Sequence, residues 1–568
     1  MNSVTSTRPT PLSDLAYFNA ATMVADPLHY KDALKHPQAE GWAKAFQTEL
    51  DAMETMKVWR YVQLPPDRRA IGCRWVSRTK YDAQGNIARL KARIVVKGYS
   101  QIEGKDFNET FAPVLKYTTL RVLLSIIATL DYEFLQFDVP TAFLNADLKE
   151  VVYMDVPEGV AGRETMPPGT VCLLLKTLYG LKQSPREWNK DLDATILALG
   201  WKRCAADSCL YVKTSATGKA MFLPVFVDDG FPAAHRTDMT ELMVDLKSIM
   251  VKYHIKDLCE AELVLGMRIR RNRAARTLTL DHQLSIVRLG ETHQMLPGAK
   301  PLLTPMLGTA IGDITDEPVP SAAPDDETEE QQIAAQARSN FPHYRSIVGA
   351  LNYIAASVRP DISFCVSFLA SSLIDPQVSH WRAARRCLQY LLGTSELGLT
   401  YGANCTTDMI DPVQLGPSYC DASWAGDVRG RRSQLAYVMQ VNGGTVSWAS
   451  QKQSTVARSS CESEYVSMSN ATCEIIWLRT LLHEMGFEQS HATVLYCDNQ
   501  PAIDLAHDTG INTRTKHIDI AHHFMRDHIE QHRLRVLHMP TDRQLADMLT
   551  KSLGAHKHIQ NRDRIMQT

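Results

Sequence analysis

The strongest constraint on this chain lies in residues 219–234, which read K-A-M-F-L-P-V-F-V-D-D-G-F-P-A-A. Apolar runs rich in β-branched and aromatic residues flank Asp228, Asp229 and Gly230, which predicts a β-hairpin with both acids at or beside its tip. A turn needs one such acid, whereas two ionised neighbours repel unless a cation lies between them. An isolated D-D-G is most often a solvated turn, so its interpretation depends on the rest of the chain.

A third acid, Asp138, ends another strand-like run in the stretch L-Q-F-D-V-P-T-A-F-L-N. Carboxylates on two neighbouring strands can hold two magnesium ions about 3.5–4 Å apart, the arrangement used for phosphoryl and nucleotidyl transfer. We therefore expect Asp138, Asp228 and Asp229 to converge on a metal site that serves such a reaction.

Three motifs make this expectation specific. F-D-V-P-T-A-F-L-N, L-Y-G-L-K-Q-S-P-R-E-W (178–188) and F-V-D-D have the order and spacing of reverse transcriptase motifs, and they resemble copia-type LTR retrotransposon pol proteins. The resemblance implies a right-hand polymerase with fingers, a palm built on a ferredoxin-like sheet, and a thumb. It also implies Mg²⁺, with Mn²⁺ as the alternative, held by Asp138, Asp228, Asp229 and the backbone carbonyl of Val139.

The resemblance also implies contacts to the incoming nucleotide. Lys91 and Arg93 lie in a basic segment that alternates like a β-hairpin, with its turn at 82–86, and resembles the fingers hairpin that grips the triphosphate. The alternative is a solvated strand face. Phe143 matches a bulky gate against the ribose 2′-hydroxyl, and the alternative is a core aromatic.

Gly180 and Gln183 belong to the motif that resembles the nucleotide and template platform, where glycine permits close backbone approach to a base or sugar. The sequence departs from the usual family wording at Pro140, Ala146, Phe226 and Gly230. None of these changes removes a metal ligand, but Gly230 is expected to loosen the hairpin that aims both acids.

The segment L-G-M-R-I (265–269) resembles the start of the thumb, and a basic cluster lies within it and just after it. Its members are expected to contact backbone phosphates of the duplex: Arg268, Arg270, Arg271, Arg273 and Arg276.

From residue 417 onward, strands alternate with helices, and four acids at strand ends or helix starts resemble those of ribonuclease H in order: Asp421, Glu464, Asp498 and Asp547. Such acids would converge on two metals that activate water against an RNA phosphodiester, whereas any one of them alone could be a helix cap or a surface charge. Ser459 and Glu462 fit a capping box, and Glu464 lies about 200° around the helix from Glu462, so the chemistry is assigned to Glu464. R-T-K-H-I-D-I (514–520) is a further copia-type signature.

Two patterns are interpreted as structural. The D-T-G triplet at 508–510 has no protease-length domain around it. A run of histidines lacks the paired cysteines of a zinc site, and we expect the first to orient nucleic acid and the others to lie on a helix surface: His517, His522, His523, His528 and His532.

Composition is that of a globular protein of two to four domains, with 568 residues, 45% hydrophobic and 22% charged. The net charge of −2 does not itself indicate nucleic-acid binding, although local basic patches suffice for it. The start is not a secretory signal, and the apolar runs are too short for a bilayer. The expected organisation is a lead-in (1–30), a reverse transcriptase (31–307), an acidic linker (308–340), a helical connection (341–415), a ribonuclease H-like domain (416–556) and a tail (557–568).

The predicted fold is a multidomain combination of α/β and α+β classes, and the predicted function is RNA-directed DNA polymerase with ribonuclease H. Expected partners are an RNA template, a DNA primer, an RNA–DNA hybrid and dNTPs, together with other retrotransposon pol or capsid products, and no membrane. The expected location is intracellular, in cytoplasmic particles, with nuclear entry as an option. The alternative is a decayed or host-adopted copy that binds nucleic acid or acts as a ribonuclease H alone.

Overall fold

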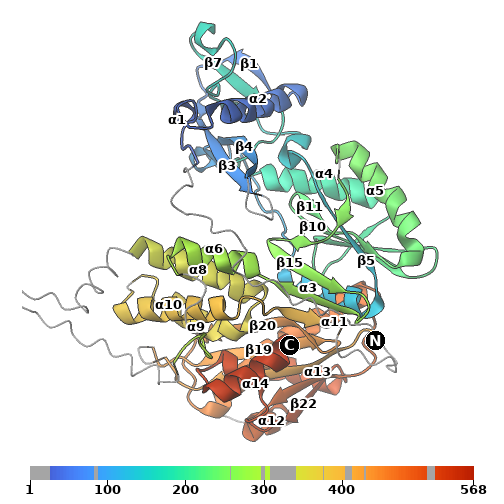
Figure 1. Ribbon diagram of the computed structural model, residues 1–568. Coiled ribbons are helices and arrows are strands. Elements are labelled where there is room, and N and C mark those ends of the chain that lie inside the picture. The colour runs from blue at the N-terminus through green and yellow to red at the C-terminus, as the bar shows by residue number, and fades with distance from the viewer. Residues whose placement is uncertain are drawn as a thin grey trace, which may run out of the picture. The chain divides into compact units, whose positions relative to one another are not determined.

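A computed structural model describes most of the chain (Figure 1), namely residues 26–81, 87–255, 257–295, 301–307, 341–374, 376–402, 412–427, 430–507 and 519–567. The chain divides into two units, Met1–Pro113 with Val139–Thr195, and Val114–Asp138 with Ile196–Thr568. Both units mix helices and strands, so the predicted multidomain combination of α/β and α+β folds is confirmed. The predicted linker (308–340) lies outside the described residues.

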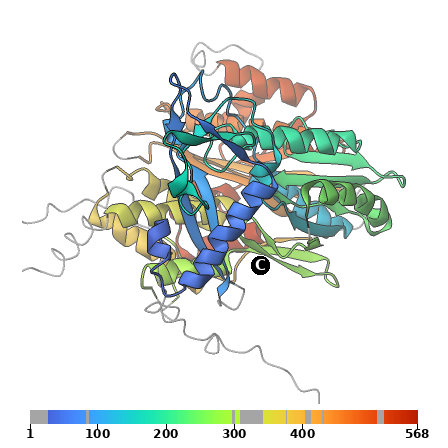
Figure 2. The same cartoon turned by 90° about the horizontal axis from the view of Figure 1, so that it is seen from above.

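The first unit is organised around a long hairpin, β3 (Cys73–Tyr81) and β4 (Ile87–Val96), as predicted, although its turn lies outside the described residues. Helix α2 packs on β4 (Figure 2), and Trp42, Phe46 and Trp75 are buried in the core beside it. The other elements are α1 (Tyr30–Ala33), α2 (Ala39–Thr55), β1 (Trp59–Gln63), β2 (Ala70–Ile71), β6 (Tyr153–Met154), β7 (Thr170–Leu174) and α4 (Ser184–Ala198), which crosses into the second unit.

The second unit begins with the apolar helix α3 (Tyr117–Leu130) and continues into β5 (Glu133–Asp138). Strand β5 pairs antiparallel with β11, β12 and β13 in a seven-stranded sheet. The other elements of this sheet and the helix that follows are β8 (Lys202–Arg203), β9 (Leu210–Thr214), β10 (Ala220–Phe226), β11 (Asp229–Gly230), β12 (Ala233–Ala234), β13 (Cys259–Glu260) and α5 (Met239–Tyr253).

A four-stranded sheet then joins segments that are distant in sequence, because β17 of the predicted helical connection pairs with β16. Helix α6 packs with α8, α9 and α10 around a shared apolar core. These elements are β14 (Leu263–Val264), β15 (Met267–Asn272), β16 (Thr277–Asp281), α6 (Gln283–Thr292), α8 (Phe341–Ser357), α9 (Ser363–Ala370), α10 (Val378–Gly393) and β17 (Leu399–Tyr401).

The C-terminal part is a five-stranded sheet in the order β20-β19-β18-β21-β22, with β18, β21 and β22 parallel to one another. Helix α11 packs against β18 and β19. The elements are β18 (Leu415–Ser423), β19 (Gln434–Val441), β20 (Gly444–Lys452), α11 (Ser460–Glu484), β21 (Thr493–Cys497), α12 (Gln500–His507), α13 (Asp519–Glu530), β22 (Leu534–His538), the short 3₁₀ helix η9 (Leu545–Leu549) and α14 (Ala555–Met566).

Some segments are more ordered than predicted. Residues 557–568, expected to form a tail, lie largely in α14, where Ile565 and Met566 are fully buried. The sequence of this helix is mostly polar, so its burial was not predicted. Its few apolar residues lie on one face, and that face packs against the core. In the predicted lead-in, Asp26 accepts hydrogen bonds from the backbone N–H and hydroxyl of Thr79. No helix in the described part of the chain has the length and apolarity needed to cross a membrane.

A buried guanidinium fixes α3 to the C-terminal part of the second unit. Arg121, on α3, is 4% exposed, and it donates to the backbone oxygens of Val446 (2.6 Å), Ala356 (2.8 Å) and Ser357 (2.9 Å). Its guanidinium carbon lies 4.0 Å from the centroid of the Trp448 ring. Burial lowers the pKa of Arg121 to about 10, so the side chain keeps its charge at neutral pH.

We predict that Arg121→Met destabilises the second unit, because three backbone carbonyl groups lose the donor that this buried side chain provides. The expected loss is about 3 kcal/mol in the free energy of unfolding, measured by urea denaturation. Arg288→Met, at an exposed position on α6, is the control and should change it by less than about 0.5 kcal/mol. Equal losses in the two variants would contradict the assigned role of Arg121.

Candidate active sites

The first acidic site lies on the hairpin of β10 and β11, as predicted. Phe226 pairs with Asp229 across the hairpin, which leaves Val227 and Asp228 as the two-residue turn. Asp229 in turn pairs with Asp138 at the end of β5, so backbone hydrogen bonding places these two acids directly opposite each other. The structure thus brings Asp138, Asp228 and Asp229 together, and Val139 follows Asp138 with a buried side chain.

The electrostatics of this site reflect crowding of like charges. Burial, and then the carboxylates of Asp228 and Asp138, raise the pKa of Asp229 to about 7. A divalent cation among these oxygens would relieve the repulsion, and carboxylate oxygens are the ligands that Mg²⁺ prefers. The residues present therefore fit the predicted metal.

Gly230 does not loosen the hairpin, because the ring of Phe137 fills the space beside it. Gly230 pairs with Phe137 across β11 and β5, and a Cβ atom on Gly230 would lie 2.1 Å from the Phe137 ring. The Phe137 side chain therefore compensates for the missing side chain at Gly230. The strand register, which the sequence alone does not give, identifies this partner.

In the first unit, an aromatic side chain missed by the sequence analysis links two predicted nucleotide contacts. The Arg93 guanidinium lies 4.3 Å from the centroid of the Tyr179 ring, and the Phe143 ring packs edge-on against the same ring at 5.1 Å. Lys91 lies two residues before Arg93, on the same face of β4. Tyr179 stands directly before Gly180 in the L-Y-G-L-K-Q-S motif. This position within a family motif is the sequence feature that could have identified Tyr179 as a site residue.

The structure gives Gly180 and Gln183 packing roles. Gly180 has φ +93°, and a Cβ there would lie 2.2 Å from the backbone oxygen of Val96, so the close approach is to the chain's own backbone. The Gln183 side chain is fully buried, where it donates to the Asp106 backbone oxygen at 2.8 Å and accepts from Gln101 at 3.0 Å. Contact of either residue with a nucleotide stays a prediction.

Most of the arginines expected to contact phosphates are paired within the protein. Arg268 and Arg270 both bind the fully buried carboxylate of Asp281. Arg271 binds Asp131, and Arg273 binds Glu133 at 2.6 Å. These ion pairs offset part of the positive charge, although Arg268 and Arg270 share a single carboxylate. Contact of these arginines with phosphates stays a prediction.

The second acidic site forms where parallel strands end. Ser418 pairs with Leu495 and Tyr419 with Tyr496, so Asp421 on β18 and Asp498 after β21 lie at the same edge. Glu464 is buried on α11, and one of its oxygens, an Asp498 oxygen and the Cys497 Sγ all lie within 4.8 Å of one another. Asp547 is fully buried in η9, a single short 3₁₀ turn.

The four acids share one electrostatic environment. Burial, and then the Asp547 carboxylate, raise the pKa of Asp421, while burial and then Asp421 raise that of Glu464. The hydroxyl of Thr550 donates to Asp421, and that of Thr541 donates to Asp498 at 2.8 Å.

Two lysines that the sequence analysis did not single out accompany the acids of the second site. The ammonium groups of Lys551 and Lys557 both form ion pairs with Asp547. The Lys551 ammonium contacts the Asp547 Oδ1 atom, and the Lys557 ammonium contacts Oδ2. The carboxylate oxygens gathered at this site are the ligand type that a divalent cation prefers.

Ser459 is the N-cap of α11, as predicted, but the Glu462 carboxylate turns to Arg458 and does not complete a capping box with Ser459. The backbone N–H of Glu462 donates to Ser459 Oγ, and the Glu462 carboxylate accepts from the backbone N–H of Arg458, which leaves Glu464 for the site. His528 is 7% exposed, so the prediction of a surface position was wrong for it, whereas His532 is exposed. The D-T-G triplet and His517 lie outside the described residues, and so do the side chains of His522 and His523.

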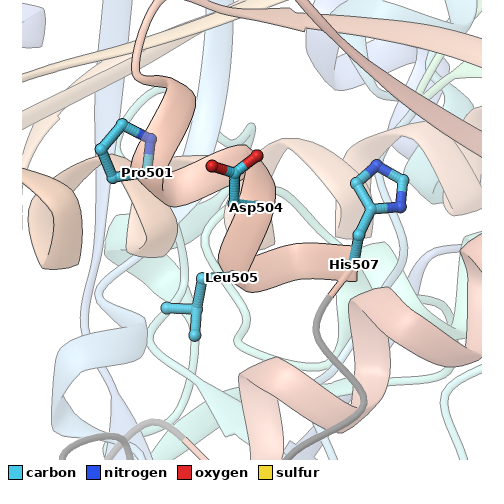
Figure 3. A pocket seen from close by; sticks show the side chains of 4 residues that line it. All are labelled: Pro501, Asp504, Leu505 and His507. Atoms are coloured by element: carbon cyan, nitrogen blue, oxygen red, sulfur yellow. The ribbon is translucent and has the colours of Figure 1, made fainter.

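A hollow beside α12 contains none of the predicted site residues. It is lined by Pro501, Asp504, Leu505 and His507, and Asp504 and His507 extend on the side opposite Leu505 (Figure 3). Gln500 Nε2 donates to Asp504 at 2.7 Å, so this carboxylate already has a partner within its own helix.

Comparison with known proteins agrees with this geometry. Residues 56–308 match the family described as reverse transcriptase (RNA-dependent DNA polymerase). The Retrovirus-related Pol polyprotein from transposon TNT 1-94 of Nicotiana tabacum is 37% identical over 94% of this chain and 38% of its own length. The putative transposon Ty5-1 protein of Saccharomyces cerevisiae is 30% identical over 60% of this chain and its whole length. The chain belongs to the copia-type retrotransposon Pol family.

This Pol chain spans little more than a third of the length of the transposon polyproteins that it matches. A second such relative, from transposon RE1 of Arabidopsis thaliana, is 35% identical over 96% of this chain and 35% of its own length. A solved structure of a foamy viral protease-reverse transcriptase in complex with RNA/DNA hybrid covers 89% of this chain and 54% of that chain, with a TM-score of 0.44 and 12% identity.

We predict that Asp229→Asn stabilises the metal-free Pol chain in a pH-dependent way. The folded-state pKa of about 7 lies above the ordinary 3.8, so ionising Asp229 opposes folding, and this penalty grows between about pH 4 and pH 7. The thermal midpoint of the variant, relative to the unsubstituted chain, should therefore rise across this window and then level off. The measurement is a series of thermal scans with a chelator, with Asp542→Asn at an exposed position as control. A shift of equal size at pH 4 and pH 8 would be inconsistent with this origin.

Gly230→Leu, which introduces a larger apolar side chain of the kind more typical of the family, is expected to destabilise the protein by about 1–3 kcal/mol through overpacking against Phe137. In a Phe137→Ala background the same substitution should cost less, because the cavity accepts the new side chain. A double-mutant cycle by denaturation should give a coupling energy of about 1 kcal/mol or more. Additive effects would refute the compensation.

Proposed function

We propose that this chain is an RNA-directed DNA polymerase with a ribonuclease H activity that degrades the RNA of RNA–DNA hybrids. The observation that carries the proposal is the backbone pairing of Asp138 with Asp229 beside the Asp228 turn, within the part of the chain that matches the reverse transcriptase family. The second site, with Asp421, Glu464, Asp498 and Asp547 gathered at one sheet edge, supports the nuclease.

In the polymerase site, the carboxylates of Asp138, Asp228 and Asp229, with the Val139 carbonyl, would hold Mg²⁺ or Mn²⁺. Such ions supply Lewis-acid stabilisation of the charge that develops on phosphoryl oxygens. Lys91 and Arg93 would bind the triphosphate, and the Tyr179 ring would hold the Arg93 guanidinium in place through their contact. Phe143, packed against the same ring, would exclude a ribose 2′-hydroxyl.

In the nuclease site, the four acids would hold the ions and orient a water toward the RNA phosphodiester. Thr541 and Thr550 fix the orientation of Asp498 and Asp421 by donating to their carboxylates. Lys551 and Lys557 lower the local negative charge, which would otherwise repel the phosphate backbone.

The proposed partners are an RNA template, a DNA primer, the RNA–DNA hybrid and dNTPs, with other retrotransposon pol or capsid products in cytoplasmic particles and an option of nuclear entry. The alternative is a decayed copy or a ribonuclease H alone. One argument for it was that Gly230 would loosen the hairpin that carries the acids. Gly230 is accommodated by Phe137, and the acidic pair is aimed by regular strand pairing.

The test is primer extension on an RNA template with Mg²⁺, with cleavage of a labelled RNA–DNA hybrid measured on the same preparations. Asp228→Asn should lower dNTP incorporation by roughly a hundredfold or more, because it removes a proposed metal ligand, and should leave cleavage intact. Asp498→Asn is the matched variant and should have the opposite effect.

Absence of incorporation in the unsubstituted chain, beside cleavage that Asp498→Asn abolishes, would overturn the polymerase and leave the nuclease. Loss of both activities in either single variant would show that the substitution acts on folding. The two activities could then not be assigned to separate sites.

A further inference from the structure

The nuclease site contains a thiol that the proposed cleavage chemistry does not use. Cys497 is the last residue of β21, directly before Asp498, and its side chain is fully buried. Its Sγ atom donates to Glu464 Oε2 at 3.9 Å. A buried free cysteine usually packs as a small apolar side chain, but this one faces two carboxylates.

The three groups lie close enough to share one ion. One atom each from Glu464, Cys497 and Asp498 lie within 4.8 Å of one another, the one such grouping of metal-binding side chains found within the described residues. Zinc binds sulfur at about 2.3 Å and carboxylate oxygen at about 2.0–2.2 Å, so ligands across a tetrahedral ion lie roughly 3.5 Å apart. Small rotations of the side chains would bring the three atoms to that spacing.

A second thiol supports the position of the first. Cys420 precedes Asp421 on the neighbouring parallel strand β18, at the level of Cys497 in the strand register. Cys420 is also fully buried, and its Sγ lies 3.5 Å from the Tyr496 backbone oxygen. The strand pairing that aligns Asp421 with Asp498 thus also brings sulfur to the acidic site.

We propose that Glu464, Cys497 and Asp498 form a site for a thiophilic divalent cation, Zn²⁺ or Cd²⁺, and that such an ion inhibits hybrid cleavage by occupying two of its acids. Sulfur is a poor ligand for Mg²⁺ and a good one for these softer ions, so the thiol separates the two classes of cation. Binding displaces the thiol proton to solvent. The inhibition rests on the proposed nuclease function, whereas the ion binding does not.

The first arm of the test measures binding without activity. The full chain, kept reduced by a phosphine, is titrated with Cd²⁺ while the ultraviolet thiolate-to-cadmium charge-transfer band is followed. Cys497→Ser should lower the Cd²⁺ affinity of the tightest site at least tenfold. Cys172→Ser, which removes a buried thiol of the first unit, should leave that affinity unchanged.

Cys497→Ala is measured beside Cys497→Ser, with thermal scans of both, so that a folding defect in one variant does not decide the outcome. Equal Cd²⁺ affinity in the unsubstituted chain and in a folded Cys497 variant would overturn the site.

The second arm measures hybrid cleavage in Mg²⁺ with added Zn²⁺, each variant being normalised to its own rate without Zn²⁺. The Zn²⁺ concentration for half inhibition should be at least tenfold higher in a Cys497 variant than in the Cys172→Ser control. Equal inhibition of both would overturn the overlap with the catalytic acids. If the chain binds Cd²⁺ through Cys497 but neither it nor any variant cleaves the hybrid, the ion site is supported and the proposed nuclease function is wrong.

Discussion

In both acidic sites, backbone hydrogen bonds between paired strands hold negatively charged side chains close together. Asp138 and Asp229 are opposed by strand pairing, and Asp421 and Asp498 by the parallel register of β18 and β21. Burial works against ionisation in both places and raises the pKa of Asp229, Asp421 and Glu464. The sheets therefore supply the free energy that keeps each cluster assembled, and the clusters in return have a strong affinity for positive charge.

In the second acidic site, two lysine side chains offset part of this negative charge. Lys551 follows the acid Asp547 by four residues, just past the end of η9, and Lys557 reaches the same carboxylate from α14. The docking of α14 thus has an electrostatic consequence, because it delivers a cation to a fully buried acid. Asp547 would cost far more to bury without these ammonium groups, since an isolated ionised carboxylate is strongly destabilised away from water.

The sequence was sufficient for features that local pattern encodes. Alternating apolar runs ending in acids predicted β5, β10 and β21, and helical geometry correctly separated Glu462 from Glu464. The same local pattern could not identify partners brought together by folding. Tyr179 beneath Arg93, Phe137 beside Gly230 and the acids that pair with Arg268 and Arg273 are set by strand register and by packing between distant segments. Gln183 matched a family motif, but only its burial shows that the amide braces a neighbouring loop.

The acids of both sites are anchored in one core of the second unit. A continuous set of buried side chains runs from Phe134 and Phe231, next to the first acidic site, to Leu495 and Cys497, next to the second acidic site. Arg121 strengthens this continuity, because it binds backbone oxygens of α8 and β20 from the helix that leads into β5. Side chains packed at the density of a protein interior yield little to applied strain. The two acidic clusters are therefore anchored in one shared core of the second unit.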